Sequence, residues 1–112
     1  MIGRDIIVTI PKSISWQEYT KELNAVKDGS KVLNFKTANF PQTKVGNKCY
    51  LIHDGEVKGW MKIVGLVEDS FACDVTGKKW AGKFIQRSGP FHYINPIEMK
   101  GFQGFRYVNF NL

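Results

Sequence analysis

The chain has 112 residues, including 16 lysines and arginines and 10 aspartates and glutamates, which give it a formal net charge of +6. A chain of this length forms one domain rather than two, and its 43% of hydrophobic residues exclude an intrinsically disordered protein. No apolar run approaches the roughly 18 residues of a membrane-spanning helix, and no signal-peptide cleavage region follows the first apolar stretch, so we expect a cytoplasmic protein without a membrane partner.

The positive charge is concentrated in the later part of the chain. Residues 1–30 contain four basic and four acidic side chains, so residues 31–112 carry all six net positive charges. Such a surface either keeps the protein soluble or binds a polyanion such as nucleic acid. The two cysteines, Cys49 and Cys73, are too few for a disulfide framework, and we expect both to be reduced.

The N-terminal part of the chain predicts a strand followed by a helix. Residues 5–10 are rich in isoleucine and valine and stop at Pro11, as a strand does before a turn. Ser15 and Glu18 have the spacing of a capping box, which begins a helix. Apolar residues then recur at three- and four-residue intervals: Trp16, Tyr19, Leu23 and Val26. Asp28-Gly29 predicts the end of this helix, because glycine tolerates the left-handed conformation at a helix C-terminus.

The remainder of the chain predicts strands. Residues 32–35 form a short strand, and residues 37–46 form a loop. Residues 48–53 and 56–67 flank Asp54-Gly55, a strong signal for a β-hairpin. Further strands are expected over residues 71–75, 80–86 and 102–110, separated by turns at Thr76-Gly77, Ser88-Gly89-Pro90 and Asn95-Pro96. We therefore predict a mainly β (α+β) fold, in which residues 1–112 form one small β-barrel with a single covering helix near the N-terminus.

The hairpin predicts which side chains share a face. If His53 pairs with Glu56, then Tyr50 lies opposite Gly59, and Trp60 lies between Lys58 and Lys62 on the other face. This face has two interpretations. The indole is a base-stacking platform beside a phosphate track, or the helix packs over this face and Trp60 belongs to the core.

Residues 86–93 predict a second candidate site. An arginine precedes a Ser-Gly-Pro turn that is followed by Phe91, His92 and Tyr93. We expect an exposed Arg87 on a loop over a cleft, where it contacts phosphate. The aromatic residues either contact a base or fill the end of the barrel.

Residues 29–36, Gly-Ser-Lys-Val-Leu-Asn-Phe-Lys, directly follow the predicted helix. They resemble the G-x-K-x-x-E-x-R signature of ASCH domains, a branch of the PUA-like superfamily. Residues 45–48, Val-Gly-Asn-Lys, precede a predicted strand, and Gly55 and Gly59 follow in the next strand. This arrangement resembles the entry into that family's central barrel hairpin. The resemblance implies a small PUA-like β-barrel.

The resemblance also implies a cleft at the edge of the barrel, lined by Lys31. In the branch that hydrolyses acylated cytidine derivatives, this lysine is catalytic. Asn34 stands where the signature has glutamate, or threonine in the hydrolytic branch, and Lys36 replaces the arginine. An amide serves neither as a nucleophile nor as a general base, whereas it can pair with the edge of a base while lysines hold phosphate.

These observations favour a binding module for RNA or a modified nucleotide. Its expected nucleotide-binding residues are Lys31, Asn34, Lys36, Lys58, Trp60, Lys62 and Arg87. A second hypothesis is a small amidohydrolase that acts on acylated (deoxy)cytidine-type nucleosides, with Lys31 as its catalytic amine. A third is a protein-interaction domain whose basic face meets an acidic partner. We expect no cofactor, and the histidines and cysteines lack the spacing of a metal site.

Overall fold

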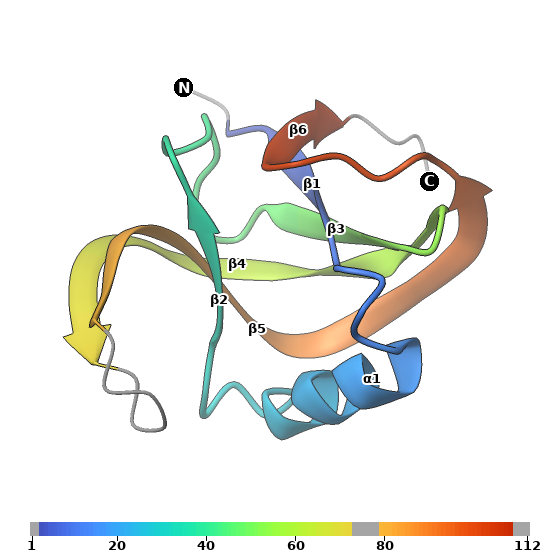
Figure 1. Cartoon of the computed structure of the whole chain (residues 1–112), viewed down its shortest axis with the longest axis horizontal. Coiled ribbons are helices and arrows are strands. Elements are labelled where there is room, and N and C mark those ends of the chain that lie inside the picture. The colour runs from blue at the N-terminus through green and yellow to red at the C-terminus, as the bar shows by residue number, and fades with distance from the viewer. Residues whose placement is uncertain (1–2, 73–78, 109–112) are drawn as a thin grey trace.

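The computed structural model describes residues 3–72 and 79–108. Within these residues the elements are β1 (Asp5–Thr9), α1 (Trp16–Ala25), β2 (Leu33–Thr37), β3 (Lys48–His53), β4 (Glu56–Ala72), β5 (Lys79–Glu98) and β6 (Phe105–Val108). The strands form one sheet in the order β2-β5-β4-β3-β1-β6, which curls into a half-barrel (Figure 1). Among the strands of these described residues, β1 and β3 pair in parallel and the other pairs are antiparallel. The predicted mainly β fold with one helix is confirmed.

Both faces of the sheet are covered, which makes β3 a buried strand. On one face α1 packs against a core that includes Leu51, Met61 and Ile85. On the other face a second core forms around Tyr50 and Ile52. Cys49 to His53 are all buried, so the strand reads as a continuous apolar run without alternation.

The hairpin of β3 and β4 contains a β-bulge that the sequence prediction lacked. His53 pairs with Glu56 as predicted, but the register then shifts, and Tyr50 lies opposite Trp60 rather than Gly59. Lys58 is the additional residue in β4. A one-residue bulge moves all following side chains to the opposite face. The predicted face was therefore wrong, and Trp60 packs with the Tyr50 core, on the face opposite α1.

Strand β5 continues through both proline-containing segments that were predicted to be turns. Ser88 pairs with Lys62 and His92 pairs with Trp60, so Gly89, Pro90 and Phe91 lie opposite Met61 alone, in an irregularity where β5 has extra residues. Asn95-Pro96 lies in a second irregularity of the same kind. Proline fits at a bulge because it needs no ladder hydrogen bond there. These irregularities bend β4 and β5 together and curl the sheet (Figure 1).

Helix α1 begins as predicted and ends earlier. Ser15 is its N-cap, and its hydroxyl accepts a hydrogen bond from the Glu18 amide at 3.1 Å. The helix ends at Ala25 rather than at Asp28-Gly29. The carbonyl oxygen of Val26 accepts instead from the amides of Gly29 and Gly89, and this second bond ties the helix end to β5.

The remaining predicted boundaries are partly confirmed. Residues 71–72 continue β4, while residues 73–75 and the predicted turn at Thr76-Gly77 lie outside the described part of the chain. The predicted strand over residues 80–86 is the start of β5. The last strand begins at Phe105 rather than at residue 102. Within the described residues, no helix has the length and hydropathy needed to cross a membrane.

Candidate functional site

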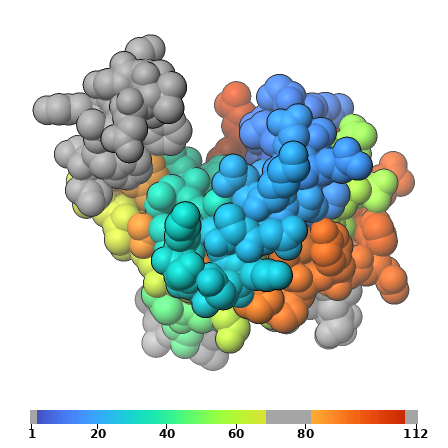
Figure 2. Space-filling view, turned by 90° about the horizontal axis from the view of Figure 1, so that it is seen from below, coloured from blue at the N-terminus to red at the C-terminus, as the bar shows by residue number. Residues whose placement is uncertain are grey.

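A cleft lies between α1 and β2. Its volume is about 820 Å³, within the range of about 300–1,000 Å³ that is usual for small-molecule sites. Four parts of the chain line it, namely the end of β1 with the loop after it, one face of α1, β2, and Arg87 of β5. Figure 2 shows this side of the molecule, where the blue side chains of α1 and the teal side chains of the following segment lie next to each other.

Arg87 forms the floor of the cleft, and its side chain is only 2% exposed. The prediction that Arg87 is exposed on a loop was wrong, because residue 87 is part of β5. It pairs with Ile63 on one side and with Leu33 on the other, so it sits inside the sheet. Its side chain points to the face that α1 covers, where Tyr19 and Cys49 interact with the guanidinium.

The guanidinium of Arg87 has few partners for a buried charge. Its Nε and Nη1 atoms have no hydrogen-bond acceptor within the described residues. Its central carbon lies 5.9 Å from the centroid of the Phe35 ring. Burial acts to lower the pKa of the guanidinium, but Tyr19 and Cys49 raise it, and the net shift is upward. Arg87 therefore remains positively charged.

Strand β2 brings two of the predicted residues to the cleft and leaves out the third. Asn34 and Lys36 both line it, and the Asn34 Oδ1 accepts a hydrogen bond from Gln86 Nε2 at 3.3 Å. Lys31 precedes β2, is exposed and does not line the cleft. Its carbonyl oxygen accepts a hydrogen bond from Ser88. Lys31 therefore lies outside this cleft, since it precedes Leu33, the first residue of β2.

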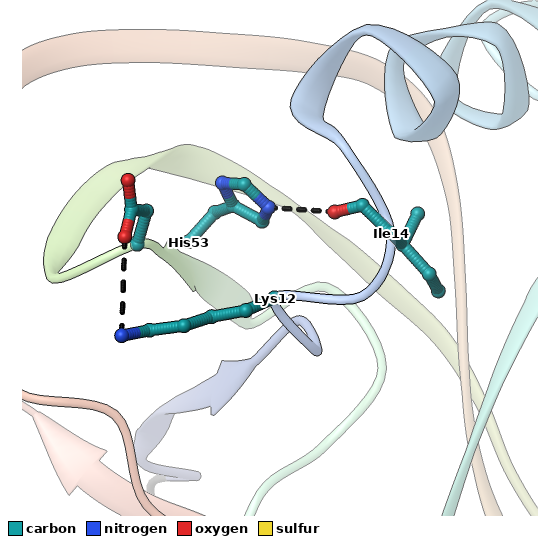
Figure 3. A network of polar contacts seen from close by, with 4 residues as sticks. Lys12, Ile14 and His53 are labelled. Atoms are coloured by element: carbon teal, nitrogen blue, oxygen red, sulfur yellow. Dashed lines mark hydrogen bonds and ion pairs between the residues drawn. The ribbon is translucent and has the colours of Figure 1, made fainter.

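The loop between β1 and α1 forms another wall of the cleft and is held by the β3–β4 hairpin. His53 is buried, and its Nε2 lies 2.7 Å from the carbonyl oxygen of Ile14 (Figure 3). Because a carbonyl oxygen only accepts, Nε2 is the donor. Lys12 Nζ lies 4.0 Å from Asp54 on the exposed side of the same loop. These contacts place Ile14 and Pro11 along the cleft.

The other predicted basic and aromatic residues lie on β4. Lys58 Nζ is 3.8 Å from a Glu56 carboxylate oxygen. Trp60 is half-buried and stacks on His92, with 4.1 Å between ring centroids, while Lys48 Nζ lies 4.7 Å from the indole centroid. The indole is therefore occupied by protein groups rather than available as a stacking platform. Neither Lys58, Trp60 nor Lys62 lines the cleft.

The aromatic residues after Arg87 also lie away from the cleft. Phe91 packs against the core under α1, with its ring centroid 5.6 Å from that of Trp16. Tyr93 is 64% exposed and meets Trp16 edge-on at 6.4 Å. Both line a smaller pocket beside the end of α1. Phe91 thus fills space against the helix, whereas Tyr93 remains at the surface.

Several residues of the cleft were not predicted from the sequence. Glu18 and Glu22 line it from α1, and Tyr19 contacts Arg87. The helical periodicity predicted that Tyr19 faces the core. It carried no information on which strand the helix crosses, so the neighbour of Tyr19 was unpredictable.

Cys49 interacts with Arg87 and is fully buried. Burial raises the pKa of its thiol from 9.0 to about 11, although Arg87 acts in the opposite direction. The unfolded thiol ionises near pH 9 while the folded one stays protonated, so the unfolded chain binds fewer protons between these values. The free energy of unfolding should consequently fall as the pH rises from 9 to 11, by about 2–3 kcal/mol.

Chemical denaturation of the wild type and of Cys49→Ala across this range measures the effect. Tyr50, whose pKa is also raised by burial and by Asp5, is present in both proteins and cancels in the difference. Equal slopes in the two proteins would contradict the assignment to Cys49.

The cleft shows no sign of a metal centre. No group of three histidine, cysteine, aspartate or glutamate side chains suited to a metal ion occurs within residues 3–72 and 79–108. No known protein family, curated protein or solved structure matches the chain. The residues of the cleft are therefore the basis for a functional proposal.

Proposed function

We propose that this protein is a binding module for RNA or a modified nucleotide, and that a nucleotide of the ligand enters the cleft between α1 and β2. The buried guanidinium of Arg87 carries this proposal. Arg87 lines the cleft, and two nitrogen atoms of its guanidinium are buried without an acceptor within the described residues. Such donors favour a ligand rich in oxygen acceptors.

The rest of the cleft suits the other parts of a nucleotide. Leu33, Phe35 and Ile14 provide apolar surface for a base or a sugar. The side-chain amide of Asn34 can pair with the edge of a base, and Lys36 provides a flexible positive charge for phosphate. The mainly β fold with one helix also agrees with the resemblance of residues 29–36 to ASCH domains.

The net charge of +6 supports binding to a polyanion, but the charge is not confined to the cleft. Lys58, Trp60 and Lys62 lie on β4 outside the cleft lining. Trp60 and Lys58 already have protein partners. We therefore assign nucleotide binding to Asn34, Lys36 and Arg87 and give the β4 residues no direct contact with the bound nucleotide.

No geometric observation favours the amidohydrolase. Its catalytic lysine would be Lys31, which lies outside the cleft lining. The protein-interaction hypothesis likewise has no specific contact surface in its favour. Nucleotide binding is the function that the cleft supports best.

Lys36→Ala should weaken RNA binding about threefold to tenfold and reduce the salt dependence, because a lysine that contacts phosphate releases about one counterion. Fluorescence anisotropy with short single-stranded and structured RNAs at several salt concentrations measures this. Lys44→Ala is the matched control, because Lys44 is also exposed, carries the same charge and lies outside the cleft. Absence of salt-sensitive binding to every RNA would contradict the proposed function.

A further inference from the structure

We infer that Arg87 recognises a terminal phosphate, so that the cleft takes the phosphorylated end of a nucleotide or RNA rather than an internal phosphodiester. This inference rests on the proposed function and names the ligand class of the same cleft. It makes Arg87 the residue that determines specificity.

Arg87 has no counter-charge among the described residues. The ion pairs formed within the described residues join Lys12 to Asp54 and Lys58 to Glu56, and neither includes Arg87. The guanidinium meets a phenol and a thiol, from Tyr19 and Cys49, instead of a carboxylate. A buried charge without a counter-charge is unfavourable, and a bound anion would supply one.

The guanidinium of Arg87 also has several N–H donors without an acceptor within the described residues. Nε carries one N–H and Nη1 carries two, and none of these has an acceptor within the described residues. Phosphate offers several oxygen acceptors around one centre, and arginine binds it with more than one hydrogen bond. The hydroxyl of Tyr19, which contacts the same guanidinium, can donate to a further phosphate oxygen.

The floor of the cleft at Arg87 is formed by paired strands. Arg87 belongs to a strand that is paired on both sides, by β2 and β4, and Cys49 interacts with its guanidinium. Tyr19 of α1 lies against the guanidinium from the helix side. The sheet and the helix therefore enclose the guanidinium on these sides, and the cleft that Arg87 lines is the side from which a ligand would approach it. An internal phosphodiester needs an exit for the chain on both sides, whereas a terminal phosphomonoester does not.

The charges on α1 favour the same ligand. Glu18 and Glu22 are exposed and line the cleft, so the helix presents carboxylates as well as Lys21. Carboxylates repel a sugar–phosphate backbone that runs along the cleft. One terminal phosphate bound at Arg87 places no sugar–phosphate backbone along these carboxylates, and Arg87 supplies the positive charge that offsets their repulsion. A terminal phosphate also carries more negative charge than a diester, since its second pKa is about 6.

The test compares ligands that differ only in the terminal phosphate. Short RNAs with a 5′-phosphate, with a 3′-phosphate and with neither are titrated by anisotropy, with the dye on the opposite end. Nucleoside monophosphates and their nucleosides are compared by calorimetry. We expect one terminal phosphate to tighten binding at least tenfold in the wild type, and millimolar inorganic phosphate to displace only the phosphorylated RNA.

Arg87→Met removes the charge and retains an unbranched apolar side chain. The preference for phosphate should fall below twofold in this variant. Arg106→Met is the matched control, because Arg106 is exposed, stacks on Phe102 and does not line the cleft. It should retain the tenfold preference. If Arg87→Met does not fold, the competition with inorganic phosphate in the wild type decides the question.

The outcomes separate this inference from the proposed function. Equal binding of phosphorylated and unphosphorylated ligands by the wild type would overturn the inference and leave nucleotide binding in place. A preference for phosphate that survives in Arg87→Met would also overturn it. Binding of inorganic phosphate with no gain from a nucleoside would overturn the proposed function and leave an anion site at Arg87. No binding of any ligand would overturn both.

Discussion

Arg87→Met is expected to raise the free energy of unfolding of the ligand-free protein by about 1–3 kcal/mol, while it removes the response to phosphate. The wild-type guanidinium is 2% exposed and has no carboxylate partner within the described residues. Its removal from water is therefore poorly compensated in the free protein. Methionine occupies much of the same volume without burying a charge, and its flexible side chain adapts to an irregular cavity.

Urea denaturation of both proteins without ligand measures this gain in stability. Arg106→Met should change the free energy of unfolding by no more than about 0.5 kcal/mol, because its side chain is exposed. Addition of a phosphorylated ligand should stabilise the wild type and leave Arg87→Met unchanged. A loss of more than about 1 kcal/mol in Arg87→Met would show that the guanidinium is well compensated by Tyr19 and Cys49, and would contradict the argument from unpaired charge.

Gly59→Ala is expected to lower the free energy of unfolding by about 1–3 kcal/mol or more. Gly59 lies in β4 opposite Tyr93, at a position where β5 leaves no room for a side chain. A Cβ atom there would overlap the backbone carbonyl oxygen of His92 and press on the Phe91 ring. Backbone within a paired strand cannot move aside, so the strands would have to separate locally.

Gly65→Ala is the control for this prediction. Gly65 also lies in β4, faces β5 and has no positive φ angle. Its added Cβ would meet the end of the Gln86 side chain, which can rotate away. Thermal or urea unfolding should therefore show a much smaller loss for Gly65→Ala. Similar losses in the free energy of unfolding for the two variants would show that the contact with His92 and Phe91 is not the reason that position 59 requires glycine.

Features that depend on near neighbours in the chain were predictable. The Ser15 cap requires only the amide of Glu18, three residues away, and the β3–β4 hairpin requires Asp54-Gly55 at its turn. Asp54 and Gly55 both adopt positive φ angles there, as this turn demands. The single helix and the mainly β class follow from such local signals.

The candidate site was predictable only in part. The resemblance of residues 29–36 to the ASCH signature, together with their place in a short strand, predicts Asn34 and Lys36 as site residues, and the Ser-Gly-Pro segment after residue 87 predicts Arg87. The predicted exposure of Arg87 was wrong, since this segment continues a strand instead of forming a turn. The positive charge of Arg87 therefore lies at the floor of the cleft rather than on the surface loop that the sequence predicts.

The sequence by itself determined the class of the fold, the position of its helix and hairpin, and a basic polar strand after the helix. Only the tertiary structure decided the bulges of β4 and β5, the face on which Trp60 lies, and the meeting of Tyr19, Cys49 and Arg87. The physical reason is the range of the interactions. Caps and tight turns are satisfied within a few residues, whereas a bulge depends on how two strands fit the layers above and below them. Arg87 is buried because β2, β4 and α1 converge on it, and no short segment of the chain contains that information.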